Sequence, residues 1–268
     1  MLYKAKNGHI PFPGTDMDYI RFGTGKKTLI LLPGLGDGLR TIRGMADPLA
    51  VVYRIFAKEY TVFAFSRKNR MPRGYTTRDM ARDQRRAMEA LGIRQADVLG
   101  VSMGGMIAQH LAADAPEMVH RLVLAATCPC PNEVLVESIN EWIDCAQRGD
   151  HRELMMSNLQ RIYTSDAAAH KKWLVPVVGK LSKPKSYDRF YVQAQACATH
   201  DARPRLSMIS APTLVIGGEQ DQLLGNEGSY QLAREIPKAR LYMYRDYGHG
   251  FYEQAKDYPR RVMGFLME

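Results

Sequence analysis

The stretch Gly100-Val101-Ser102-Met103-Gly104 places a serine between a short apolar run and a helix-like run. Glycine near a helix start costs about 1 kcal/mol relative to alanine, so glycines on both sides of the serine need a steric reason. The spacing matches G-x-S-x-G, a sharp turn between a strand and a helix that holds a serine hydroxyl at the carboxyl edge of a sheet. We therefore predict that Ser102 is a nucleophile, and that side chains at positions 100 and 104 would collide with the turn.

Strand-like and helix-like segments alternate on both sides of this turn. We expect strands over 17–22, 28–32, 60–65, 98–101, 121–126, 213–216 and 240–244. We expect helices over 42–57, from a cap at 76–79 to Gly92, and over 103–113, 229–235 and 255–266. This order predicts an α/β fold with a parallel sheet and right-handed crossovers.

The alternation stops between Cys130 and Pro204. Helical patterns run there over 133–147, 152–163 and 187–199, with no convincing strand between them. We therefore predict a core formed by residues 1–129 and 205–268, and a helical insertion formed by residues 130–204.

A serine nucleophile needs a base to take its proton, and that base is usually histidine. His249 lies in a glycine-flanked loop between the last expected strand and the last expected helix, as the chain order of such triads requires. The remaining histidines lie in other settings, with those of the insertion interpreted as surface residues: His9, His110, His120, His151, His170 and His200. His249 is the predicted base.

The base in turn needs a carboxylate that fixes its tautomer. Asp221 follows the expected strand over 213–216, in a loop at the same edge of the sheet as Ser102. Glu219 is the alternative, although a solvated loop acid explains it as well. Asp201 and Asp246 are more simply explained as exposed turn residues.

The developing oxyanion needs two backbone N–H donors. The amide of Met103 is one, because it follows the nucleophile directly. The loop over 31–38, rich in glycine, supplies the other, and Leu35 is the best donor in it. A plain turn remains the alternative explanation of this loop.

Bulk properties exclude several classes of protein. The chain has 268 residues with 46% hydrophobic content, enough for one large core carrying an insertion. No run approaches the roughly 18 apolar residues of a membrane span, and residues 1–10 lack the apolar core of a signal peptide. We expect a cytoplasmic protein without a membrane span; a homo-oligomer is compatible with the sequence.

Neither the charge nor the cysteines demand a special partner. The formal charge is +9, and its densest basic region, 67–86, reads as an amphipathic helix with an arginine-rich polar face. No nucleic-acid module accompanies it, so we expect no nucleic-acid partner. Without framework or zinc-site spacing, four cysteines are expected to be free thiols: Cys128, Cys130, Cys145 and Cys197. We expect no metal and no organic cofactor.

Four segments together carry a resemblance to a known family. The chain resembles the α/β-hydrolase superfamily in "LILLPGLGDG", "VLGVSMGGMIAQ", "APTLVIGGEQD" and "DYGHGFYEQ", and looks most like its small esterases and lactonases. Pro33-Gly34 stands where many members have His-Gly. The resemblance implies an eight-stranded, mostly parallel sheet with helices on both faces, and a helical cap after the sixth strand.

The resemblance also implies how the insertion and the triad are used. The cap is expected to close over Ser102, with six candidate lining residues that ordinary packing would also explain: Trp142, Met155, Met156, Trp173, Phe190 and Tyr191. The implied activity is hydrolysis of a small carboxylic ester or lactone. Hydrolysis of a carbon–carbon bond or thioester, and cofactor-free peroxidation, use the same residues, and a non-catalytic ligand receptor is a further alternative.

Overall fold

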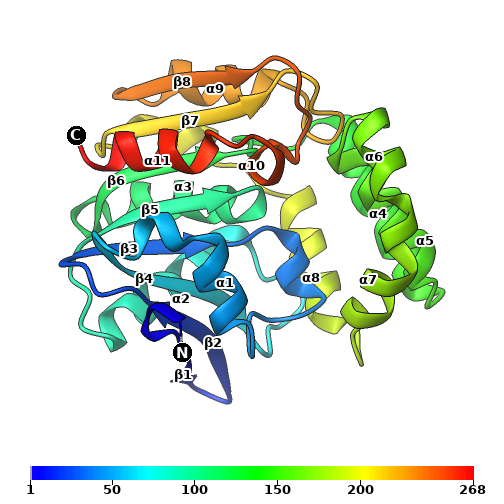
Figure 1. Ribbon diagram of the computed structural model, residues 1–268, viewed down its shortest axis with the longest axis horizontal. Coiled ribbons are helices and arrows are strands. Elements are labelled where there is room, and N and C mark those ends of the chain that lie inside the picture. Colours follow the sequence, from blue (N-terminus) through cyan, green and yellow to red (C-terminus); the bar gives the residue numbers. More distant parts are fainter. Residues whose placement is uncertain (1) are drawn as a thin grey trace.

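The apolar runs of the sequence form the centre of one eight-stranded sheet (Figure 1). The computed structural model describes residues 2–268 of the chain. The strand order is β1-β2-β4-β3-β5-β6-β7-β8; β2 is antiparallel to its neighbours and the other pairs are parallel. The strands are β1 (Lys6–Phe12), β2 (Thr15–Phe22), β3 (Lys27–Leu32), β4 (Tyr60–Lys68), β5 (Ala96–Val101), β6 (Val119–Ala125), β7 (Thr213–Gly218) and β8 (Ala239–Tyr244). Every residue of β5 and β7 is buried, as expected for central parallel strands covered on both faces.

Helices cover both faces of the sheet. They are α1 (Ala46–Val52), α2 (Thr77–Ala90), α3 (Met103–Asp114), α9 (Glu227–Glu235), α10 (Phe251–Gln254) and α11 (Tyr258–Leu266). One core cluster joins the sheet to α2, α3 and α9, and a second joins its other face to α1 and α11. The parallel strands β3, β5 and β7 end at one edge of the sheet, so the loops that follow them meet there.

The insertion lies between β6 and β7 and is helical, as the sequence predicts. Its helices are α4 (Glu133–Gln147), α5 (His151–Ile162), α6 (Ser165–Lys171), α7 (Val175–Ser182) and α8 (Asp188–Ala198). Figure 1 shows them beside the carboxyl ends of the strands. The sequence did not reveal α6 and α7, which are short. Residues 130–204 remain our proposed limits for this cap.

Three local expectations were wrong. The first strand, β1, was missed because it is a mostly exposed edge strand without a buried periodicity. The expected helix over 42–57 is reduced to α1, since Gly44 has a φ of 83° that interrupts it. The expected last helix begins at Tyr258 instead of residue 255, because Ala255 is extended and separates it from α10.

No helix within residues 2–268 combines the length and the apolar character needed to cross a membrane. Residues 77–86, the second half of the basic region over 67–86, lie in α2, a helix with a strongly apolar side, whereas Arg67 and Lys68 end β4. The side of α2 towards the core contains Met80, Ala87 and Met88. The amphipathic interpretation is therefore confirmed for the helical half of this region, and the half before residue 77 is not helical.

Candidate active site

Ser102 occupies the turn between β5 and α3. Its φ of 55° and ψ of −123° are rare for a residue with a side chain, and such strain is found mostly where function requires it. The Ser102 amide donates a hydrogen bond of 2.9 Å to the Ala125 carbonyl of β6, which anchors the turn to the sheet. The turn thus holds the hydroxyl at the carboxyl edge of the sheet.

The glycines beside Ser102 are sterically required, as the sequence predicts. A Cβ atom at Gly104 would lie 1.9 Å from the carbonyl oxygen of Leu32, at the end of β3. A Cβ atom at Gly100 would lie 2.5 Å from the Gly104 carbonyl oxygen. A side chain at either position would therefore push the strand ends and the helix apart.

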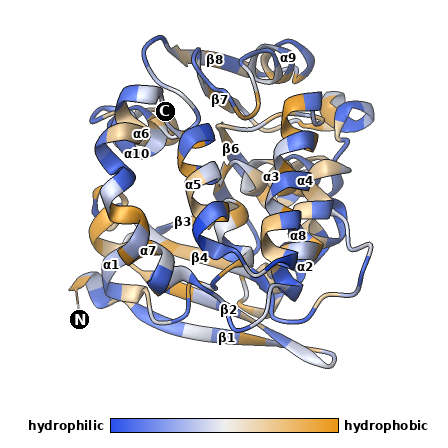
Figure 2. Cartoon of the chain, turned by 90° about the vertical axis from the view of Figure 1, so that its right-hand side faces the viewer, coloured by the Kyte–Doolittle hydropathy of each residue, from blue (hydrophilic) through white to orange (hydrophobic). Residues whose placement is uncertain are grey.

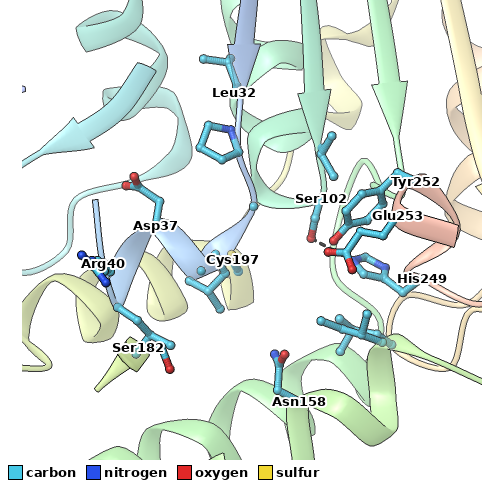
Figure 3. Close-up of a pocket in the computed structure, with 18 of the residues that line it drawn as sticks. Leu32, Asp37, Arg40, Ser102, Asn158, Ser182, Cys197, His249, Tyr252 and Glu253 are labelled. Atoms are coloured by element: carbon cyan, nitrogen blue, oxygen red, sulfur yellow. Dashed lines mark hydrogen bonds between the residues drawn. The ribbon is translucent and has the colours of Figure 1, made fainter. Parts of the chain in front are cut away.

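His249 and Asp221 complete a hydrogen-bonded row with Ser102. The distance from Ser102 Oγ to His249 Nε2 is 3.0 Å (Figure 3). The distance from His249 Nδ1 to Asp221 Oδ2 is 2.8 Å. The amides of Leu223 and Leu224 each donate 2.9 Å hydrogen bonds to Asp221 Oδ1, which leaves Oδ2 for the imidazole. His249 and Asp221 are buried, so the carboxylate holds the Nδ1–H tautomer and leaves Nε2 to accept from Ser102. The structure brings together the three residues that the sequence singles out.

The two predicted oxyanion donors are the first residues of two helices that meet at Ser102. Leu35 begins η2 (Leu35–Gly38) and Met103 begins α3. The N–H groups of a first helical turn have no acceptor within their own helix, so both are available to a ligand. A Cβ atom at Gly34 would lie 3.4 Å from Ser102 Cβ, which places the start of η2 directly beside the nucleophile.

Glu219, the alternative acid, is engaged elsewhere. Its carboxylate accepts hydrogen bonds of 2.8 Å from Asn226 and 2.6 Å from Tyr230. Hydrogen bonds from Tyr230 and Asn226 lower the pKa of Glu219. This residue therefore stabilises the loop after β7, while Asp221 faces the histidine.

A buried ionic cluster supports η2, and the sequence did not reveal it. Asp37 accepts hydrogen bonds of 2.6 Å from Ser66 Oγ, 3.1 Å from the Arg67 amide and 2.8 Å from Arg189 Nη2. Arg67 Nη2 donates 2.5 Å to the Pro33 carbonyl, and burial lowers the pKa of Arg67. The Asp37–Arg189 contact spans 152 sequence positions, so no local pattern signals it.

Ser102 and His249 open into a cavity of about 700 Å³ between the sheet and the cap helices. Three of the six predicted lining residues face it: Trp142, Met155 and Phe190. The other three lie elsewhere, and their prediction was wrong. Met156 follows Met155 on α5 and points about 100° away; Trp173 is exposed to solvent; Tyr191 packs against Tyr187 and Phe190.

The cavity has a few polar groups that the sequence did not suggest. Figure 3 shows Asn158 of α5 pointing towards the space in front of Ser102, with Glu253 beside His249 and Arg40 at the far side. The cavity lining contains one aspartate, Asp37, one arginine, Arg40, and one glutamate, Glu253. Most of the remaining lining is apolar. Tyr163 donates a hydrogen bond to Glu253, and burial keeps the pKa of Tyr163 far above its usual value. The one sequence signal that Glu253 belongs to the site was its position, four residues after His249.

Two of the histidines expected at the surface are buried instead. His200 shares a 2.9 Å hydrogen bond with Thr77 and packs edge-on against His110, while His151 lies between Tyr187 and Ser182. Burial lowers the pKa of His110 to about 4 and that of His200 to about 3. These rings are therefore neutral near pH 7 and belong to the packing of the molecule.

The described part of the chain, residues 2–268, has no cluster of three or more histidine, cysteine or acidic side chains that could hold a metal. Its four cysteines are free thiols, as expected, and three of them are buried: Cys128, Cys145 and Cys197. Burial raises the pKa of Cys197, which lines the cavity, to about 12. This thiol is therefore protonated at neutral pH.

Comparison with known proteins identifies the family and agrees with the fold. Residues 27–256 match the family model described as "alpha/beta hydrolase fold". The putative non-heme bromoperoxidase BpoC of Mycobacterium tuberculosis is 30% identical over 201 residues, covering 72% of this chain and 76% of the relative. A 2-hydroxy-6-oxononadienedioate/2-hydroxy-6-oxononatrienedioate hydrolase of Paraburkholderia xenovorans is 27% identical over 93% of this chain and 90% of the relative. The crystal structure of the enol-lactonase from Burkholderia xenovorans superposes with a TM-score of 0.81 at 24% identity, covering 97% and 100% of the two chains.

Proposed function

The chain belongs to the alpha/beta hydrolase fold family, and from this premise we propose that it is a serine hydrolase cleaving a small carboxylic ester or lactone. The observation that carries the proposal is the row from Ser102 through His249 to Asp221, with contacts of 3.0 and 2.8 Å, at the wall of a largely apolar cavity. A serine and an imidazole in hydrogen-bond contact are the elements of acyl transfer.

In this mechanism Ser102 Oγ attacks the substrate carbonyl while His249 Nε2 takes its proton. Asp221 stabilises the imidazolium and keeps its orientation. The amides of Leu35 and Met103 donate to the oxyanion, after which His249 returns the proton to the leaving alcohol. Water, deprotonated by His249, then attacks the acyl-enzyme and releases the acid and Ser102.

The charges of the cavity favour an uncharged acyl group. The residues that line the cavity include one arginine, Arg40, two acids, Asp37 and Glu253, and no lysine. Asp37 is already paired with Arg189. A substrate carboxylate would therefore find one cation, at the solvent-exposed far side of the cavity, whereas an apolar acyl chain finds abundant apolar contact.

The proposal is tested by turnover of chromogenic esters of increasing acyl length and of lactones of increasing ring size. A fluorophosphonate probe should label the wild-type protein and should not label Ser102→Ala. Ser186→Ala is the matched control, because Ser186 is exposed and hydrogen-bonds only within its own turn. Equal labelling of wild type and Ser102→Ala, or ester binding without turnover, would reject the proposal.

A second candidate is hydrolysis of a carbon–carbon bond in an oxo acid. The observation that favours it is the relative named for 2-hydroxy-6-oxononadienedioate, which aligns with nearly the whole chain. That name specifies a dicarboxylate, for which this cavity offers little positive charge. Turnover of such a diacid faster than of any neutral ester, with loss of that activity in Arg40→Gln, would establish the second candidate over the first.

A further inference from the structure

Helix α7 and the short helix η5 (Lys172–Leu174) before it turn large apolar side chains towards solvent. The exposed fractions are 72% for Trp173, 58% for Val177, 44% for Val178 and 67% for Leu181. Positions 173, 177 and 181 are spaced by four, so their side chains form one ridge along the helical segment. A surface helix normally shows its polar side to water, and this segment does the reverse.

The opposite side of α7 is already used. Val175 and Gly179 are buried, and a Cβ atom at Gly179 would lie 3.9 Å from Met155 Cγ of α5. The exposed ridge is therefore not the side by which α7 packs onto the cap. It is free for a partner outside the chain.

Lysines flank this ridge along its own segment, and two acids, Asp150 and Glu153, lie beside Lys172 and Val175 on the side towards α5. Residues 171–185 contain five lysines and neither aspartate nor glutamate. Four of the lysines are exposed: Lys172, Lys180, Lys183 and Lys185. Lysine buries its aliphatic stem at an apolar boundary and keeps its ammonium in the polar layer, so it suits the rim of such a surface.

The ridge adjoins the mouth of the active-site cavity. Val178 and Ser182 of α7 line that cavity, and the carbonyl of Leu181 accepts a 3.3 Å hydrogen bond from Arg40, which lines it too. Figure 2 shows α7 on the side of the molecule formed by the cap. The exposed apolar surface thus continues into the largely apolar lining around Ser102.

We propose that the segment 171–185 docks the protein on the surface of a bilayer that contains anionic phospholipids. The ridge enters the boundary between headgroups and acyl chains, Trp173 takes the interfacial position that tryptophan favours, and the lysines face the lipid phosphates. Docking would set the cavity mouth against the lipid, so that an ester with an apolar acyl chain enters without crossing water. Only this last step depends on the proposed function.

The chain carries its own reporter for the test. Its two tryptophans are Trp142, which is buried, and Trp173, which is exposed. Vesicles of phosphatidylglycerol and phosphatidylcholine should shift the tryptophan emission to the blue and shield it from acrylamide. Vesicles of phosphatidylcholine alone should have a much smaller effect, since charge attraction is then missing.

Two variants that keep Trp173 separate the contributions. Val177→Ser/Leu181→Ser removes apolar contact, and Lys172→Gln/Lys180→Gln/Lys183→Gln/Lys185→Gln removes charge; each should weaken vesicle binding about tenfold or more. The matched control replaces four exposed lysines at the starts of strands, on the edge opposite the cap, and should bind as wild type: Lys6, Lys26, Lys58 and Lys238, each to Gln.

Ser102→Ala should bind vesicles as tightly as the wild type, so the docking result does not depend on turnover. Two results would overturn the proposal. One is unchanged emission with anionic vesicles. The other is a blue shift that appears without vesicles as protein concentration and molecular mass rise together, which would make the ridge a contact between two copies of the chain.

Discussion

Arg189 of the cap helix α8 donates a 2.8 Å hydrogen bond to Asp37 of η2, and both side chains are largely or fully buried. Arg189 also donates to the backbone carbonyls of Lys68 and Arg67, at 3.2 and 3.1 Å, so one guanidinium joins the cap to the sheet. Because η2 begins at Leu35, the pair holds the proposed oxyanion donor in place from behind. Arg189 is thus a positioning residue that does not itself face the reacting atoms.

Arg189→Met should lower kcat for ester hydrolysis about tenfold or more while changing KM little, because a donor misplaced by a fraction of an ångström is lost chiefly in the transition state. Removing one partner of a buried pair should also cost about 3–5 kcal/mol of unfolding free energy. Arg203→Met is the control, since Arg203 pairs with Asp201 at the surface, and it should leave both measurements near wild type. An unchanged kcat in Arg189→Met would refute the positioning role.

Ser102→Ala should reduce kcat at least about 10³-fold, because the nucleophile is lost. Ser102→Gly should be equally inactive yet more stable than Ser102→Ala by about 1 kcal/mol, since glycine adopts the φ of 55° without strain. Urea unfolding of the two variants measures this difference. Equal stabilities would show that the turn carries no strain.

Asp221→Asn should reduce kcat by about 10⁴-fold. The amides of Leu223 and Leu224 already donate to Oδ1, so the new amide nitrogen must face His249 Nδ1 and impose the opposite tautomer on the ring. The N–H of the His249 ring would then lie on Nε2 and point towards Ser102, so His249 could no longer act as the base. Glu219→Gln, in the alternative acid, should retain kcat; a comparable loss there would contradict the assignment.

Gly104→Ala should prevent stable folding or lower the unfolding free energy by several kcal/mol, because its Cβ would lie 1.9 Å from the Leu32 carbonyl oxygen. Gly264→Ala tests the same change where there is room. No atom lies within 4 Å of a Cβ at that helical position, so alanine should stabilise α11 by up to about 1 kcal/mol. Thermal and urea unfolding compare the two. Similar stabilities would count against the steric argument.

The buried histidines should make the protein acid-sensitive. The folded-state pKa values of His110 and His200, about 4 and about 3, lie below the ordinary 6.5, so the unfolded chain binds more protons between these limits. The contribution of these two rings to the free energy of unfolding is therefore fully present above about pH 6.5 and is lost as the pH drops towards 4. Each ring contributes about 1.4 kcal/mol for every tenfold difference in its proton affinity between the folded and the unfolded chain. His200→Gln should reduce the loss between neutral and acid pH. His170→Gln, which removes an exposed ring, should leave this loss unchanged. If the free energy of unfolding depended on pH equally in the two variants, the buried histidines would be ruled out as the cause of the acid sensitivity.

Much of the site could be predicted from local sequence. The glycines at 100 and 104, the loop around His249 and the acid after the strand over 213–216 act within a few residues of their own backbone. Parallel strands end at one edge of the sheet, so the topology predicted that Ser102, Asp221 and His249 would converge, and the structure shows that they do. The resemblance supplied the strand count and the position of the cap.

Tertiary structure alone decided which cap residues face the cavity and what holds the oxyanion loop. Apolar spacing shows that a helix has a buried side but not which element covers it, so Met155 and Met156 could not be told apart, and Trp173 passed for a pocket residue. The ion pair between residues 37 and 189, like the burial of His200 against His110, depends on chain segments that meet only after the sheet and cap have packed. The sequence by itself determined the turn, the order of the triad and the fold. The lining and the supports of the site follow from long-range packing, because a side chain's environment there is set by atoms that are distant along the chain.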